Sequence, residues 1–116
     1  MTDRPSTLER GDIVSAFMKE QADREQAGRR PFLILTPGFY NAAASTVIGC
    51  PITSNTAAYA FKVLLPEGAP VSGGVLVDQV RALDLSARRV RKLGTAPEET
   101  LADVTAILAS LLRIAP

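Results

Sequence analysis

Four large apolar residues in a row, at positions 32–35, most constrain how this chain can fold. Pro31 comes directly before the run, and Pro37-Gly38 follows it closely. A short continuous apolar run between such breakers is typical of a buried strand. We therefore predict a buried strand at residues 31–36. Arg30 directly precedes it, so this guanidinium cannot lie far from the core.

Further β-rich runs lie on both sides of this strand. The predicted additional strands span residues 13–18, 46–50, 59–65, 75–83 and 90–93. The segment 75–83 alternates, which places Val75, Val77, Gln79 and Arg81 on one face. Residues 39–41 and the alanines after them are predicted to form a turn or an irregular link, and residues 84–88 a single helical turn.

The C-terminal segment has the spacing of an amphipathic helix. Thr95 is the candidate N-cap, and Glu98 follows three residues later as in a capping box, with Pro97 in the first turn. Apolar residues recur at helical spacing at Leu101, Val104, Ile107, Leu108, Leu111 and Leu112. We expect this face to pack on a sheet or on a partner subunit. Short strands with one terminal helix predict an α+β, mainly β domain, for which a strongly bent sheet or a small barrel is the leading arrangement.

A chain of 116 residues is expected to form one domain. Residues 1–9 are polar and are predicted to be a flexible N-terminal tail, which leaves residues 10–116 for the domain. No apolar run approaches the roughly 18 residues that a membrane span needs, so no membrane contact is expected. The polar N-terminus lacks the apolar segment of a secretory signal, and a cytoplasmic location is therefore predicted.

The chain contains no histidine and one cysteine, Cys50. Neither a zinc site nor a nucleophile activated by histidine is expected, and we predict no metal and no cofactor. Cys50 lies in an apolar run and is expected to be a buried, unreactive thiol. The net charge is only +1, but basic residues gather at positions 29–30 and 88–92. Such groups can contact nucleic acid, although a solvated surface is the commoner outcome.

Several polar residues stand where predicted strands meet loops or interrupt an apolar strand. Arg30 offers forked donors for phosphate oxygens, and the Thr53 hydroxyl can donate or accept one further hydrogen bond. Taken alone, an arginine paired with Glu25 and a threonine that caps a turn are the commoner roles. Asp78 and Gln79 would be costly in a buried strand without partners, so they either form structural hydrogen bonds or line a groove.

Four motifs, in this order, resemble those of the MazF/PemK family of toxin endoribonucleases. They are Gly11-Asp12-Ile13, the stretch Glu25–Leu35 with Arg30-Pro31 before the apolar strand, Pro51-Ile52-Thr53-Ser54, and Asp78-Gln79-Val80-Arg81. Together they span nearly the whole chain, and the joint pattern is highly specific. The resemblance implies an SH3-like barrel of five to seven short strands with a C-terminal helix.

The resemblance also implies an activity: sequence-specific, metal-independent cleavage of single-stranded mRNA by the toxin of a type II toxin–antitoxin system. Attack by the RNA 2′-OH would leave a 2′,3′-cyclic phosphate and a 5′-hydroxyl. Arg30 and Thr53 would be the catalytic pair, and Glu25 would help as a proton-transfer or orienting group. The residues implied to bind RNA are Arg29, Ser54, Gln79 and Arg81. The family works as a homodimer that is silenced by a MazE-like antitoxin, whose disordered tail wraps over the groove.

The chain departs from the family pattern in its loops. Members usually have a tryptophan near Ser15 and a proline at the position of Glu20. They commonly read Lys-Gly-Tyr-Pro-Phe-Glu where residues 57–62 here are Ala-Ala-Tyr-Ala-Phe-Lys, so a phosphate contact is lost at Ala57 and a cation is gained at Lys62. Two alternatives stay open, a CcdB-like toxin that binds DNA gyrase and a catalytically weak RNA-binding barrel. The absence of tryptophan argues against the first.

Overall fold

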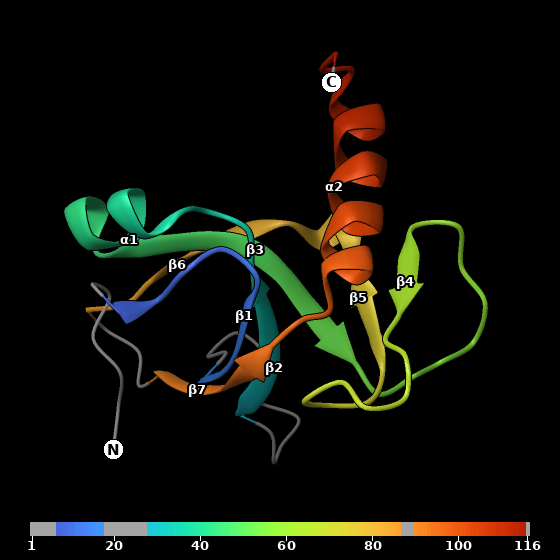
Figure 1. Ribbon diagram of the computed structural model, residues 1–116, viewed down its shortest axis with the longest axis horizontal. Helices are drawn as coiled ribbons and strands as arrows, with labels where there is room; N and C mark the ends of the chain where they lie inside the picture. Colours follow the sequence, from blue (N-terminus) through green and yellow to red (C-terminus); the bar gives the residue numbers. More distant parts are fainter. Residues whose placement is uncertain (1–6, 18–27, 87–89, 116) are drawn as a thin grey trace.

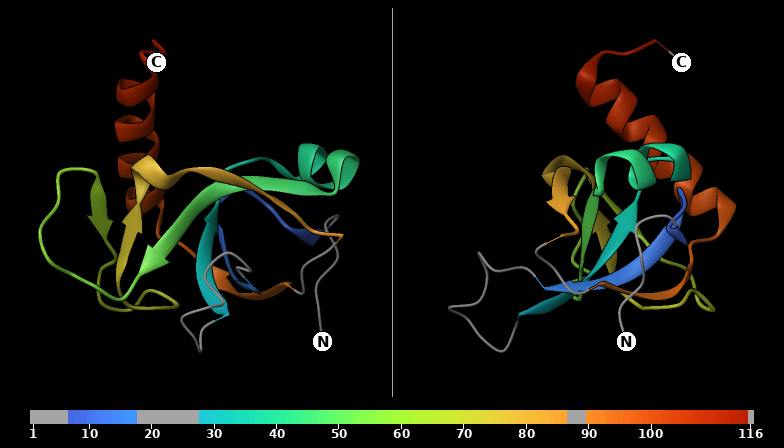
Figure 2. Two further views of the ribbon diagram at one scale, coloured as in Figure 1. Left: turned by 180° about the vertical axis from the view of Figure 1, so that it is seen from behind. Right: turned by 90° about the vertical axis from the view of Figure 1, so that its left-hand side faces the viewer.

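Strand β3 (Thr46–Thr53) is the centre of the architecture (Figure 1). The structure, a computed structural model, describes residues 7–17, 28–86 and 90–115. Within these residues seven strands form one antiparallel sheet in the order β4-β5-β3-β2-β1-β7, with β6 also paired to β3. The other strands are β1 (Asp12–Phe17), β2 (Arg29–Ile34), β4 (Lys62–Leu64), β5 (Gly74–Leu76), β6 (Arg81–Asp84) and β7 (Val90–Thr95). The expected mainly β fold with a C-terminal helix, α2 (Glu98–Leu112), is confirmed, and the sheet bends strongly (Figure 2).

The apolar run at 32–35 is buried, as predicted, and most of it belongs to β2. Alternate residues of β1 and β2 enter two separate clusters of buried side chains. Val14 and Phe32 belong to one cluster, whereas Ile13 and Leu33 belong to the other, which also contains residues of α2. Because both faces of these strands are covered, the sequence shows a continuous apolar run rather than an alternation. β2 begins at Arg29, two residues before the predicted start, so Arg30 is itself part of the strand.

The single strand predicted at 75–83 is wrong, because the chain turns in its middle. β5 ends at Leu76, a 3₁₀ turn η3 (Val77–Gln79) follows, and β6 begins at Arg81. β5 pairs with one end of β3 and β6 with the other, so the chain has to change direction between them. The turn is fixed by Val77, whose side chain is fully buried and whose N–H donates to the Phe61 carbonyl at 2.9 Å.

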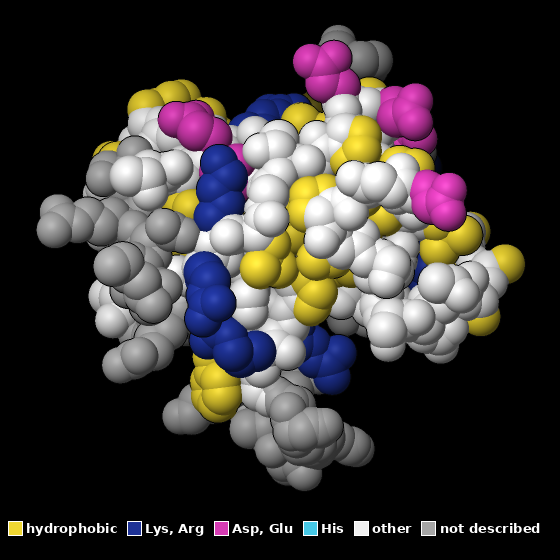
Figure 3. Space-filling model, turned by 60° about the horizontal axis from the view of Figure 1, so that its bottom comes forward, with side chains coloured by type: hydrophobic (Ala, Val, Ile, Leu, Met, Phe, Trp, Pro, Cys, Tyr) yellow, Lys and Arg dark blue, Asp and Glu magenta, His cyan; other side chains and the backbone are white. Residues whose placement is uncertain are grey.

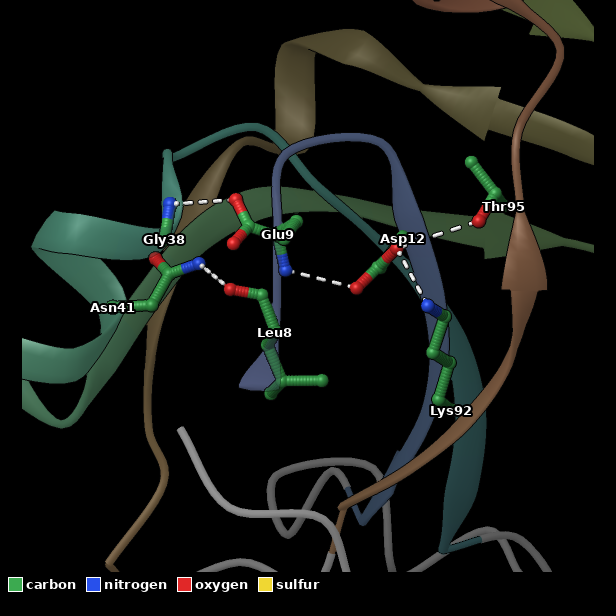
Figure 4. A network of polar contacts seen from close by, with 7 residues as sticks. All are labelled: Leu8, Glu9, Asp12, Gly38, Asn41, Lys92 and Thr95. Atoms are coloured by element: carbon green, nitrogen blue, oxygen red, sulfur yellow. Dashed lines mark hydrogen bonds and ion pairs between the residues drawn. The ribbon is translucent and has the colours of Figure 1, made fainter. Parts of the chain in front are cut away.

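The link predicted after Pro37 is a short helix, α1 (Gly38–Ala44). Its buried residue Asn41 explains why a helix forms, because the amide donates to the Leu8 carbonyl at 2.8 Å (Figure 4) and to the Thr36 carbonyl at 3.1 Å. The Glu9 carboxylate in turn accepts a hydrogen bond from the Gly38 N–H at 3.2 Å. Leu8 is fully buried, so these two residues belong to the folded domain and not to the tail expected over residues 1–9.

Helix α2 begins one residue after Pro97, and the predicted capping box is wrong. Thr95 lies in β7, and its hydroxyl is 3.5 Å from the buried Asp12 carboxylate, which also pairs with Lys92 at 3.3 Å (Figure 4). The first turns of the helix pack on the sheet through the buried Val104, whereas Leu112 near its end is exposed. Figure 1 shows the helix standing out from the sheet at that end. In the described part of the chain, no helix has the length and apolar character needed to cross a membrane.

The remaining predicted elements agree with the structure except at their ends. Strand 13–18 corresponds to β1 and strand 90–93 to β7, which continues to Thr95. The run at 46–50 continues through Pro51 to Thr53, and only residues 62–64 of the run 59–65 form a strand. Asp84, the predicted start of a helical turn, is the last residue of β6, and residues 87–89 lie outside the described part.

Candidate active site

The far end of β3 brings together residues from both of its neighbours. In the ladder between β2 and β3, Phe32 pairs with Pro51, and carrying this register two residues further sets Arg30 across from Thr53. On the other side of β3, Thr53 pairs with Gly74 of β5. The bend of the sheet therefore places a guanidinium and a hydroxyl over the same end of the central strand.

A hollow with a volume of about 310 Å³ opens at this end of β3. Its lining consists of Arg30, Pro51, Ile52, Thr53, Leu76, Gln79 and Arg81. Polar groups from β2, β3, η3 and β6 thus converge over an apolar floor. Figure 3 shows one face of the molecule, on which Lys and Arg side chains run through the middle and lower part while acidic side chains lie toward its upper edge. Two arginines in one hollow favour an anionic ligand, and a forked guanidinium matches phosphate oxygens.

Arg30 and Thr53 differ in how they are held. Among the described residues, no hydrogen bond or ion pair engages the half-buried Arg30 guanidinium. The alternative role of Arg30, an ion pair with Glu25, involves a residue outside the described part of the chain. The Thr53 hydroxyl accepts a hydrogen bond from the Asn55 N–H at 3.1 Å, so it does cap the following turn. That contact occupies a lone pair of Oγ1 and leaves the hydroxyl proton for a ligand in the hollow.

The two polar residues of η3 have separate roles. Gln79 lines the hollow together with Arg81, which lies opposite Gly49 in the ladder between β3 and β6. Asp78 instead points to the loop after β3, where its carboxylate accepts a hydrogen bond from the Tyr59 hydroxyl. This hydrogen bond, together with partial desolvation and the charge of Asp78, raises the pKa of Tyr59 above its ordinary value. The 3₁₀ turn therefore gives Asp78 a structural hydrogen bond and places Gln79 in the lining of the hollow.

The other predicted RNA-binding residues are not part of this lining. The Arg29 guanidinium donates to Ser15, through Nε to Oγ at 3.0 Å and through Nη2 to the carbonyl oxygen at 2.8 Å. Ser54 is exposed next to Thr53 and does not line the hollow. Three apolar lining residues, Pro51, Ile52 and Leu76, were not expected at the site. The sequence placed the first two in a motif without giving them a role, and it placed Leu76 inside one long strand, whereas β5 ends there.

Cys50 is fully buried on the core side of β3, as predicted, with its Sγ 3.8 Å from the Val77 carbonyl oxygen. Burial, and to a smaller extent the charge of Asp78, raises the pKa of the thiol from 9.0 to about 12. Within the described residues, no group of three or more His, Cys, Asp or Glu side chains could hold a metal ion.

The native thiol is therefore expected to react with an aromatic disulfide reagent at pH 8 at least about 100-fold more slowly than in the urea-unfolded chain, since the thiolate is the reactive form. Because the pKa of the thiol is higher in the folded protein than in the unfolded chain, keeping the thiol protonated contributes to the free energy of unfolding. This contribution is complete below pH 9 and is lost as the pH rises toward 12. Absorbance of the released thiolate measures the rate. Equal rates in the folded and unfolded protein would contradict the buried position of Cys50.

Comparisons with known proteins agree on one family. The model of the family described as "PemK-like, MazF-like toxin of type II toxin-antitoxin system" matches residues 9–112. The chain is 34% identical to the endoribonuclease PemK of Escherichia coli over 114 residues, which is 94% of this chain and 85% of PemK. It is 41% identical to the endoribonuclease toxin ChpB of Escherichia coli strain K12 over 103 residues, 84% of this chain and 88% of ChpB. A crystal structure of MazE-MazF from Deinococcus radiodurans superposes with a TM-score of 0.82 at 38% identity, covering 93% of this chain and 97% of that one.

Proposed function

Because the chain belongs to the family of PemK-like, MazF-like toxins of type II toxin–antitoxin systems, we propose that it is an endoribonuclease that cuts single-stranded mRNA at short sequence motifs. The observation that carries the proposal is the convergence of Arg30 and Thr53 on one hollow, together with Gln79 and Arg81. These groups suit a phosphodiester, which needs donors for its anionic oxygens and further contacts along the strand.

RNA supplies its own nucleophile, so the protein needs no covalent intermediate. The 2′ oxygen attacks the adjacent phosphorus, the 2′ proton passes to a base, and the bond from phosphorus to the 5′ oxygen breaks. The leaving 5′ oxygen takes up a proton, which gives a 2′,3′-cyclic phosphate and a 5′-hydroxyl. Arg30 neutralises the charge that develops on the equatorial oxygens, and Thr53 donates one further hydrogen bond.

Gln79 and Arg81 hold the RNA on either side of the reacting phosphate, and the apolar floor supports a base or a ribose. The role of Glu25 as the group that moves or orients a proton stays a prediction, since this residue lies outside the described part. Arg29 and Ser54, which do not line the hollow, are proposed to act only on more distant nucleotides.

The test is cleavage of a long unstructured RNA by purified protein in EDTA, with mapping of both new ends. The expected products carry a 2′,3′-cyclic phosphate and a 5′-hydroxyl. The 5′-hydroxyl is identified because it accepts a labelled phosphate from polynucleotide kinase without prior phosphatase treatment. A mapped series of identical 5′ ends would define the cut motif. Intact RNA at high enzyme concentration, from protein with native circular dichroism, would overturn the proposal.

The proposal includes two protein partners. One is a cognate antitoxin, in line with the solved MazE-MazF structures to which this chain is similar, and we propose that it covers the hollow. The other is a second copy of the chain, for which the exposed apolar end of α2, with Leu111, Leu112 and Ile114, offers contact surface. Sedimentation of the purified protein measures this dimer directly. Because its proposed substrate is mRNA, we place the toxin in the cytoplasm.

A further inference from the structure

Lys62, the first residue of β4, binds the loop that follows β3. Its ammonium donates to the carbonyl oxygens of Asn55 and Ala57, each at 2.7 Å. The aliphatic part of the side chain crosses Gly74, because a Cβ built on that glycine would lie 2.6 Å from Lys62 Cδ. Gly74 is the residue that pairs with Thr53. Lys62 therefore contacts both the strand beside Thr53 and the loop that follows it.

The loop carries this contact back to the hydroxyl in the hollow. Asn55 is bound at three points: its carbonyl accepts from Lys62, its N–H donates to Thr53 Oγ1 at 3.1 Å, and its side-chain oxygen accepts from the Ala57 N–H at 2.9 Å. Residues 54–60 are otherwise exposed and lie outside any strand. A segment with so few buried contacts depends on its polar contacts for a fixed shape.

We propose that Lys62 is a positioning residue for the RNA-cleaving site. Its ammonium holds the Asn55 backbone, so that the Asn55 N–H orients the Thr53 hydroxyl toward the phosphate. The inference rests on the proposed function and deepens it. With one lone pair of Oγ1 engaged by Asn55, the hydroxyl proton is kept off that side and can be donated to a phosphate oxygen in the hollow. Loss of the ammonium removes the contacts that fix the carbonyls of Asn55 and Ala57, while Tyr59 keeps its contact with Asp78 at the other end of the loop. The Asn55 N–H is then less firmly placed, and the Thr53 hydroxyl regains rotational freedom.

Lys62 acts through the loop and not on the RNA, because it does not line the hollow and two of its three donors are occupied by carbonyls. This distinction is measurable. A lysine that contacts phosphate contributes to RNA affinity and to its salt dependence. A lysine that orients a catalytic hydroxyl contributes to the rate of the chemical step and leaves affinity almost unchanged.

The experiment compares wild type with Lys62→Met, which keeps the aliphatic stem and removes the ammonium. The substrate is an RNA that contains the mapped cut motif, and an analogue with a single 2′-deoxyribose at the cut gives the dissociation constant without cleavage. We expect the single-turnover rate constant at saturating enzyme to decrease about tenfold, and the dissociation constant to change less than about twofold. Arg10→Met, which removes one exposed positive charge that neither lines the hollow nor binds the loop carbonyls, is the matched control and is expected to leave both values unchanged.

Chemical rescue separates positioning from a change in folding. Lys62→Cys treated with 2-bromoethylamine carries a near-isosteric ammonium, and its rate constant is expected to return to within about threefold of wild type. Cys50 is fully buried, so the native protein is modified at position 62, and treated wild type shows any effect of the reagent on its own. Amide exchange provides a readout that does not depend on activity: the Asn55 amide is expected to exchange at least about tenfold faster in Lys62→Met.

The outcomes distinguish this inference from the proposed function. If wild type cuts RNA and Lys62→Met cuts at the same rate, the inference is wrong and the function stands. A rise in the dissociation constant equal to the loss of activity would also overturn it, since Lys62 would then bind RNA directly. If folded wild type leaves RNA intact, the proposed function is wrong. Independently of activity, an unchanged exchange rate of the Asn55 amide in Lys62→Met would show that Lys62 does not hold the loop, and the inference would be wrong.

Discussion

Replacing Arg30 with alanine is expected to slow RNA cleavage by about 100- to 1,000-fold while the protein stays folded. The guanidinium is the forked donor aimed into the hollow beside Thr53, so its loss leaves the charge on the pentacoordinate phosphorus without its main partner. Stability should change by less than about 0.5 kcal/mol, because no described residue donates to, accepts from or pairs with this side chain. Single-turnover cleavage and urea unfolding, followed by circular dichroism, measure the two effects.

Two further variants make the result specific. Arg30→Lys keeps the charge without the planar fork and is expected to recover only part of the rate. Arg29→Ala is the matched neighbour, and its effect on the rate should be less than about tenfold, because the Arg29 guanidinium is engaged by Ser15 outside the hollow. A folded Arg30→Ala protein that cuts RNA within threefold of wild type would contradict the assignment of Arg30 to the reacting phosphate.

The sequence predicted the buried strand because burial depends on local pattern, whereas Arg30, Thr53, Gln79 and Arg81 were brought together only by the resemblance to the family. The apolar run at 32–35 has one simple solution, a buried strand, and the register that the structure gives this strand sets Arg30 toward Thr53. The alternation at 75–83 was a weaker guide. A single strand would point Val77 to the same side as Gln79 and Arg81, whereas the turn buries Val77 and directs the other two into the hollow.

The features that the sequence did not predict arise from contacts between distant segments. Helix α1 depends on a buried amide, Asn41, that binds the carbonyl of Leu8. The break after Leu76 depends on β3 changing partners from β5 to β6. The contacts of Lys62 go to backbone carbonyls, which every residue carries, so no side-chain pattern could indicate them. Local periodicity cannot contain this information, since it reports which residues are buried but not what they contact.

Replacing Gly49 with alanine is expected to lower the free energy of unfolding by about 3 kcal/mol, the largest effect on stability that we predict. Gly49 lies in the middle of β3 and pairs with Ile34 on one side and Arg81 on the other. A Cβ at this position would lie 1.9 Å from the Leu33 carbonyl oxygen and 2.8 Å from Phe32 Cε2. Because the first of these neighbours is backbone, relief requires β2 and β3 to separate at Gly49, four residues along β3 from Thr53. Urea unfolding measures the loss.

Gly68→Ala provides the contrast that identifies the cause. Gly68 has a φ of +93°, and a Cβ at this position would have no atom within 4 Å, so alanine there meets backbone strain without steric overlap. Its expected cost is about 1 kcal/mol. If Gly49→Ala lowers the free energy of unfolding no more than Gly68→Ala does, β2 and β3 can separate at little cost in free energy. The close approach of β2 to β3 would then not be what holds Arg30 and Thr53 over the same hollow.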